Sequence, residues 1–180
     1  MTLGTRVVTL GRKEMPMYDT REEVLAIMDQ VWLELRRQTD GLSNALDWRA
    51  SPDQWSARQV LSHLGGAPGQ NVLAWVQRVL REDHPAISVV GNDPFMTPER
   101  QRMRLPDLLA ELEHIYGSTA HILRTASPGD LARQGLFRFA TRPEEERTPL
   151  IIAGSSFDRH WRAHAQQLAQ LREDLGLSDI

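Results

Sequence analysis

Two histidines near the C-terminus are the first residues whose type and spacing suggest chemistry. They are His160 and His164, in the segment FDRHWRAHAQQL, residues 157–168. Positions i and i+4 of an α-helix lie on the same face, so both imidazoles would project over one turn. Helices present two imidazoles to a single metal ion with this spacing.

The position of the pair on its helix raises the question of what these rings bond to. With about 100° per residue, His160 and His164 fall inside a continuous hydrophobic stripe made by Leu150, Ala153, Phe157, Trp161, Leu168, Leu171 and Leu175. A buried imidazole needs partners for both ring nitrogens, and lacking them costs about 1–3 kcal/mol. Two interpretations stay open. The pair binds a metal, or both are core histidines bonded to backbone carbonyls or to a glutamine of a neighbouring helix.

A third ligand would decide between these interpretations, and His63 is the best candidate for it. In Val60-Leu61-Ser62-His63-Leu64 it flanks the hydrophobic stripe of another predicted helix and can lean toward the interior. His84 stands before Pro85 in a predicted loop, whereas His114 and His121 lie away from the hydrophobic stripe of their helix. We expect these last three to face solvent.

The elements that must position these histidines are helical. Four stretches have a hydrophobic period of 3.6 residues and no stretch alternates convincingly, which predicts an all-α protein folded as a four-helix bundle. The predicted helical stretches are Thr20 to Leu46, Trp55 to about Glu82, Pro106 to about Ser127, and Pro149 to Leu175. Residues 1–18 are predicted to form an N-terminal arm and residues 19–180 a single domain.

The second predicted helix contains an interruption just after His63. The sequence Gly65-Gly66-Ala67-Pro68-Gly69 follows within one turn. Proline removes a backbone N–H and crowds the carbonyl four residues earlier. We therefore expect this helix to be kinked or broken near Gly65 to Gly69, which would either open one side of a site or misplace His63.

Two segments together resemble a known family. The first is Trp55-Ser56 followed by Val60-Leu61-Ser62-His63-Leu64, and the second is His160-x-x-x-His164-x-x-Gln167-Leu168. In this order, within a four-helix pattern over residues 20–176, they resemble the DinB-like (damage-inducible) family of metal-binding four-helix bundles. The family usually continues an uninterrupted helix after the first ligand, and this chain departs from that pattern.

The resemblance implies a function as well as a fold. It implies that His63, His160 and His164 bind one divalent transition metal, and that the protein is a homodimer. Some relatives are thiol-dependent transferases or isomerases, so it also implies a metal-dependent enzyme that joins a low-molecular-weight thiol to a small electrophile, or a hydrolase. The alternative is a stress-response protein that binds a metal or ligand without turnover.

The ligand set itself limits the chemistry. Three neutral imidazoles with an open position are typical of catalytic metal sites. Imidazole suits zinc, nickel, iron and copper, so the residues do not select the metal, and we expect zinc, nickel or iron. Gln167 and Gln38 are candidates to orient the rings. No carboxylate accompanies the histidines, and the sequence therefore reveals no general base.

Composition excludes several other classes of protein. The 180 residues have a formal net charge of -3 and no cysteine, so neither disulfides nor thiolate ligands are possible. The acidic balance argues against nucleic acid as the main partner, although residues 98–106 gather three arginines. We expect no secretory signal, because residues 1–15 lack a continuous apolar segment, and no apolar run in the sequence is long enough to span a bilayer. We expect a cytoplasmic protein acting on a small molecule.

Overall fold

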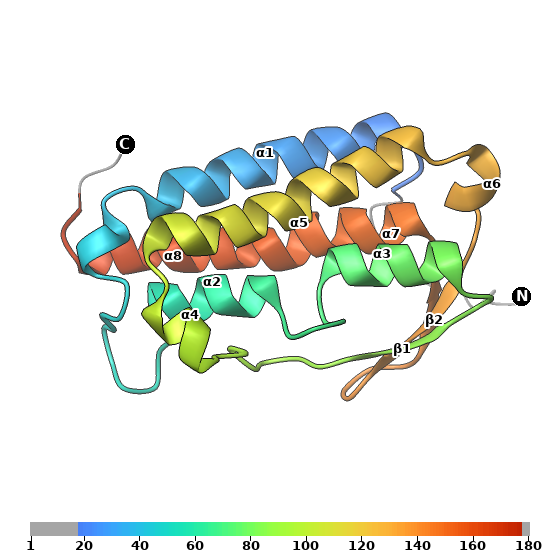
Figure 1. The fold of residues 1–180 in the computed structure, drawn as a ribbon. Helices are drawn as coiled ribbons and strands as arrows, with labels where there is room; N and C mark the ends of the chain where they lie inside the picture. The colour runs from blue at the N-terminus through green and yellow to red at the C-terminus, as the bar shows by residue number, and fades with distance from the viewer. Residues whose placement is uncertain (1–17, 178–180) are drawn as a thin grey trace, which may run out of the picture.

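The structure is a computed structural model that describes residues 18–177 (Figure 1). Within these residues, three long helical segments and a pair of shorter helices placed end to end form the four positions of a helical bundle. They are α1 (Arg21–Thr39), α5 (Leu105–Thr125), the C-terminal segment of α7 (Pro149–Ser155), the π turn η2 (Ser156–Trp161) and α8 (Arg162–Asp174), and the pair α2 (Ala57–Gly65) and α3 (Val72–Arg81). The predicted N-terminal arm lies outside the described residues except for Tyr18.

Side-chain caps fix where the first two helices begin. The hydroxyl of Thr20 accepts a hydrogen bond from the first turn of α1 at 3.2 Å. Ser56 and Gln59 form the predicted capping box of α2, in which each side chain accepts from the other residue's backbone N–H. The first helix ends at Thr39, earlier than its hydrophobic pattern predicts, and Leu42 lies instead in the 3-10 turn η1 (Leu42–Asn44).

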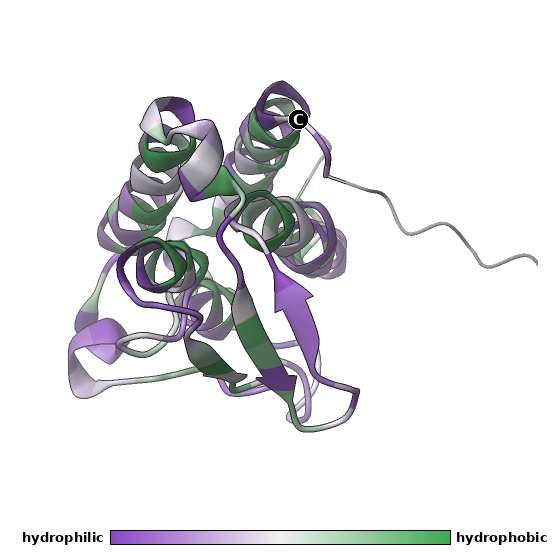
Figure 2. Ribbon diagram, turned by 90° about the vertical axis from the view of Figure 1, so that its right-hand side faces the viewer, coloured by the Kyte–Doolittle hydropathy of each residue, from purple (hydrophilic) through white to green (hydrophobic). Residues whose placement is uncertain are grey.

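The core lies between the helices, where hydrophobic residues gather (Figure 2). α1 packs against α5, α7 and α8, while α2 contacts α5 and α8 and α3 contacts α5 and α7. Phe157 and Trp161 of the C-terminal segment are buried and in ring contact, and Trp161 also lies against Trp32 of α1. This packing fixes the inner face of the segment that bears two of the candidate ligands.

The interruption after His63 separates two helices. α2 ends at Gly65, and α3 begins at Val72 after the cap residue Asn71. Gly66 has φ 68°, and a Cβ there would stand 2.2 Å from the carbonyl oxygen of Gln70. A side chain at position 66 would therefore force the connection apart, which is the reason for glycine at this position.

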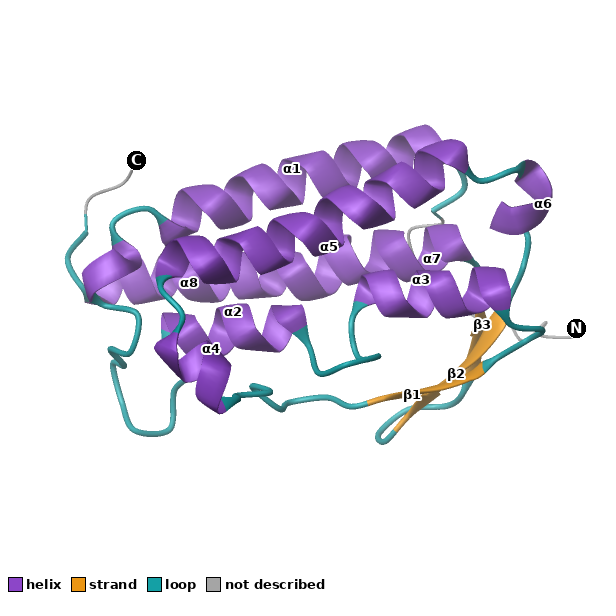
Figure 3. Ribbon diagram, in the orientation of Figure 1, coloured by secondary structure: helices purple, strands orange, loops and turns teal. Residues whose placement is uncertain are grey.

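The all-α prediction missed a small sheet, and it is corrected here. The described residues form three strands, β1 (Ala86–Val89), β2 (Gly135–Phe139) and β3 (Glu145–Arg147), in the order β1-β2-β3. β1 pairs with β2 in parallel and β2 with β3 in antiparallel orientation. The sheet lies below α3 at one end of the bundle (Figure 3), and Phe137 packs edge-on against Trp75 of α3. Strands of three to five residues are too short for alternation to reveal them.

Two surface features bear on larger partners. The arginine cluster of residues 98–106 contains the short helix α4 (Pro98–Arg102), and its Arg100 is buried and paired with Glu111. Of the three arginines in this cluster, only Arg102 and Arg104 are exposed, and each pairs with a nearby carboxylate. The cluster therefore does not form one basic patch. In the described part of the chain, no helix combines the length and the apolar character that crossing a bilayer requires.

Candidate metal centre

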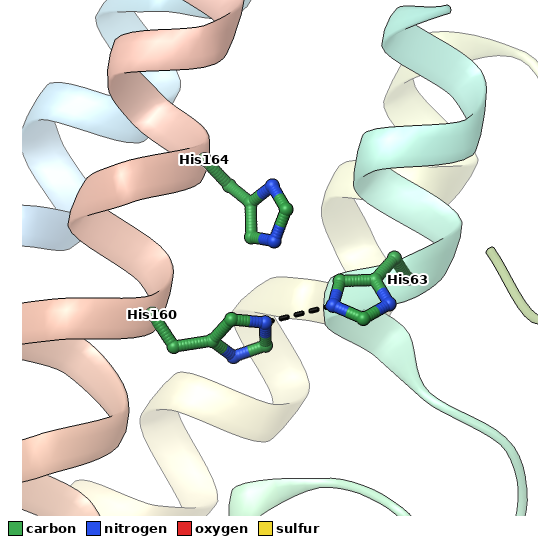
Figure 4. Close-up of side chains that lie close together, drawn as sticks. All are labelled: His63, His160 and His164. Carbon is green, nitrogen blue, oxygen red and sulfur yellow. Dashed lines mark hydrogen bonds between the residues drawn. The ribbon is translucent and has the colours of Figure 1, made fainter. Parts of the chain in front are cut away.

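Three histidines from three elements meet beside the helix interruption (Figure 4). His63 lies in the last turn of α2, His160 in the π turn η2, and His164 in the first turn of α8. The Nε2 atoms of His63 and His160 are 2.8 Å apart, and one ring nitrogen of each histidine lies within 4.8 Å of the other two. The structure thus brings together the three residues singled out in the sequence.

Hydrogen bonds behind two of the rings orient their inward nitrogens. The Nδ1 of His63 lies 2.6 Å from the carbonyl oxygen of Asp93, and the Nδ1 of His164 lies 2.9 Å from Oε1 of Gln167. Because these oxygens only accept, both Nδ1 atoms carry the proton and both Nε2 atoms carry the lone pair. The Nε2 of His160 donates to the Nε2 of His63 while no metal is bound. Fixing the tautomer in this way is what groups behind a metal-binding histidine do.

One of the two predicted orienting glutamines is wrong. Gln167 contacts His164 as expected. Gln38 instead donates to Glu34 of its own helix and bonds to none of the three rings. The acceptor for His63 is a backbone carbonyl, which every residue possesses, and no sequence pattern could have identified it.

The histidine pair borders the core and is not fully enclosed by it. His160 and His164 are half-buried and line a cavity, while Phe157 and Trp161 occupy the fully buried face. The π turn between α7 and α8 contains more residues per turn than an α-helix. The side chains before and after it therefore point in directions that differ from those given by a constant rotation of about 100° per residue. The predicted location inside the hydrophobic stripe was therefore slightly wrong.

Burial keeps the three rings neutral. It lowers the pKa of His160 to about 3, with further lowering from the neighbouring His164 and His63. Burial also lowers the pKa of His164 to about 4, against the opposing hydrogen bond to Gln167, and it lowers the pKa of His63. All three imidazoles are uncharged at neutral pH, which is the form that binds a metal.

Aromatic rings restrict how the histidines can turn. Trp55 stacks on His164 with ring centroids 6.1 Å apart and an interplanar angle of 4°. Phe95 stacks on His63 at 5.8 Å and 5°. These faces limit rotation of both imidazoles, so the inward nitrogens stay directed at one another.

A polar network holds the loop that carries Asp93 and Phe95 against α2. The hydroxyl of Ser62 donates to the carbonyl of Phe95 at 3.1 Å. Arg100 donates to the same carbonyl and to the carbonyl of Ser62, while it pairs with Glu111 of α5. Arg100 thus joins three parts of the chain directly behind His63.

The three rings line one wall of a cavity of about 720 Å³ between the helices and the sheet. This size accommodates a small molecule. The wall also contains aromatic and aliphatic side chains, three arginines, two serines and Asp53. The remaining histidines are exposed as predicted, and His84 pairs with Glu146 on the surface.

The donor set fits a divalent transition metal. Zinc binds imidazole nitrogen at about 2.0–2.1 Å, and tetrahedral angles then separate two ligand nitrogens by roughly 3.4 Å. The three ring nitrogens, mutually within 4.8 Å, bracket that separation. No aspartate, glutamate or cysteine of the described residues belongs to this group. Thiolate ligands are excluded because the sequence contains no cysteine.

Fold and site together define a helical bundle with a three-histidine site that can bind a metal ion. No family model matches the sequence, and no curated protein matches it. Among solved structures, the chain is similar to YfiT from Bacillus subtilis, described as a probable metal-dependent hydrolase with an unusual four-helix bundle topology. The TM-score is 0.71 at 20% identity, covering 93% of this chain and 94% of YfiT. At that identity the likeness establishes the fold.

Proposed function

We propose that this chain is a metal-dependent enzyme of the DinB-like type that acts on a small molecule. His63, His160 and His164 hold one zinc, nickel or iron ion. The observation that carries the proposal is the convergence of three neutral ring nitrogens on the wall of a 720 Å³ cavity. A buried structural site would have no reason to adjoin such a cavity.

A bound ion would supply a Lewis acid that polarises a substrate atom and lowers the pKa of a coordinated water or thiol. The chain's own residues hold and orient that chemistry. Asp93 and Gln167 keep the ring nitrogens directed inward, and Trp55 and Phe95 cover two ring faces.

The reaction proposed is transfer of a low-molecular-weight thiol to a small electrophile. A thiol has a pKa of about 8.5 and water a pKa of about 15.7, so a metal ion has to lower the pKa of a thiol less than that of water to ionise it at neutral pH. Asp53 is the one carboxylate among the described residues that line the cavity, and it is exposed. Hydrolysis, which the description of YfiT favours, is the second candidate, with Asp53 as the available base.

The non-catalytic alternative predicts a sealed site, and the arrangement of aromatic residues argues against it. Phe157 and Trp161 pack into the core with Trp32 and Tyr116 and do not close the cavity. The homodimer and the cytoplasmic location remain predictions. Light scattering and cell fractionation would check them.

Loss of free thiol measures the proposed reaction directly. Protein purified without an affinity tag is loaded with zinc, nickel or iron and mixed with a small thiol and a small electrophile. We expect metal-dependent consumption of both, lost in His164→Ala and kept in the exposed control His114→Ala. Ester hydrolysis without thiol consumption would shift the assignment to the second candidate. Equal rates with chelated protein would refute both.

A further inference from the structure

Three arginines give the cavity a positively charged wall. Arg142, Arg147 and Arg159 all line it, and they come from the hairpin loop, from β3 and from the π turn. Asp53 is the only acidic residue among the described lining residues. None of these arginines is among the three residues that could bind the metal.

Arg147 is the buried centre of this group. It is 7% exposed, donates to Glu145 at 3.0 Å from Nε, and donates to the hydroxyl of Ser155 at 3.1 Å. Its guanidinium also lies 5.1 Å from the ring centroid of Phe139. Burying a guanidinium is costly unless its charge is balanced, so this placement calls for a negative partner.

Glu145 balances only part of the positive charge. Arg142 pairs with the same Glu145 oxygen that Arg147 uses, at 3.0 Å. One carboxylate therefore serves two guanidinium groups, and Arg159 lines the same cavity with contacts of its own. Burial lowers the pKa of Arg147, Glu145 opposes this, and the charges of Arg142 and Arg159 lower it further. Arg142 and Arg159 therefore each lie close enough to Arg147 to repel its charge.

We propose that Arg142, Arg147 and Arg159 form an oxyanion subsite that binds a carboxylate or phosphate group of the substrate. Guanidinium groups bind planar and tetrahedral oxyanions through paired N–H donors. An anion here would offset the mutual repulsion of the arginines. The buried Ser155 and Ser156 provide hydroxyl groups on the same wall.

The other residues that line the cavity define the substrate further. The three histidines line the same cavity as the arginines. Trp75, Val89 and Phe139 line the cavity with apolar surface. The substrate class is therefore a small molecule with an oxyanion at one end, an apolar middle, and a reacting group that faces the histidines. This inference deepens the proposed function and rests on it for the reacting end only.

Anion titrations followed by NMR test the subsite. Sodium acetate and sodium sulfate are added to the full chain at constant ionic strength, in metal-loaded and in chelated protein, and the arginine Nε–H signals are recorded. Acetate represents the carboxylate and sulfate the tetrahedral oxyanion. We expect saturable shifts in both protein forms, because the arginines belong to the chain and not to the metal.

Two substitutions and one matched control separate the subsite from general charge. Arg142→Gln and Arg159→Gln should each weaken binding about three- to tenfold, and the double variant should abolish saturation. Arg138→Gln is the control, since Arg138 lies on the same hairpin, pairs with Glu144 and does not line the cavity. Arg147 is kept because it also supports the hairpin.

Three results would overturn the subsite: no saturable shift, equal affinity in the double variant, or shifts confined to the metal-loaded protein. Metal content is measured on the same samples. A wild-type protein without metal would refute the proposed function, while the titration of chelated protein would still decide whether the anion binds.

Discussion

Acid should destabilise the metal-free protein through the histidines that face the cavity. The folded-state pKa values of His160 and His164, about 3 and about 4, lie below the ordinary value of 6.5. The unfolded chain therefore takes up these protons first. The contribution of the two neutral rings is fully present above pH 6.5 and is lost as the pH falls toward the folded values.

The magnitude follows from the size of these shifts. A pH of 5 lies about 1.5 units below the pKa of the histidines in the unfolded chain. Each unit corresponds to about 1.4 kcal/mol in the free energy of unfolding. At pH 5 each histidine then lowers the free energy of unfolding by about 2 kcal/mol, and the pair lowers it by about 4 kcal/mol. The total free energy of unfolding of a typical protein is about 5–15 kcal/mol. The pKa of His63 is lowered as well, so it acts in the same direction.

Urea unfolding of chelated protein at pH 7.5 and pH 5 measures this loss. The control is the double variant His160→Gln/His164→Gln, which keeps every carboxylate and so subtracts their contribution. We expect the wild type to lose about 4 kcal/mol more than the variant between the two pH values. An equal loss in both proteins would show that the rings are not held neutral by burial, and the electrostatic reasoning about the site would fail.

Three further predictions concern the groups behind the rings. Gln167→Leu removes the acceptor for His164 Nδ1 and should weaken zinc binding about 10- to 100-fold in a chelator competition, while an unchanged affinity would exclude an orienting role. Arg100→Ala should free the loop behind His63 and also weaken zinc binding; a loss of stability with full affinity would make Arg100 purely structural. Gly66→Ala should lower the urea midpoint by the equivalent of roughly 1–3 kcal/mol, because the Cβ meets a backbone carbonyl, and an unchanged midpoint would refute that clash.

The helices could be predicted because their signals are local and long. Thr20 and Ser56 cap where the sequence indicates, and the hydrophobic period extends over several turns. The histidines could be found for a similar reason. Their i and i+4 spacing and one apolar flank determine which way the side chains project from their helices, without knowledge of the fold. Gly66 marks the end of α2 by its backbone conformation.

The sheet and the arginine group could not be predicted, since both depend on contacts between distant segments. β1 pairs with β2 across more than forty intervening residues, as Ala86 opposite Leu136 shows. That pairing brings Arg142 and Arg147 to the cavity wall, beside Arg159 of the C-terminal segment. Nothing in the spacing of these arginines indicates a common site.

Metal content of tag-free protein tests the central claim most directly. Elemental analysis combined with zinc competition is applied to the wild type, to His63→Ala and to the exposed control His121→Ala. We expect about one tightly bound metal per chain in the wild type and the control, and its loss in His63→Ala, because this ring contributes one of the three converging nitrogens. Wild-type stoichiometry and affinity in His63→Ala would contradict the three-histidine site.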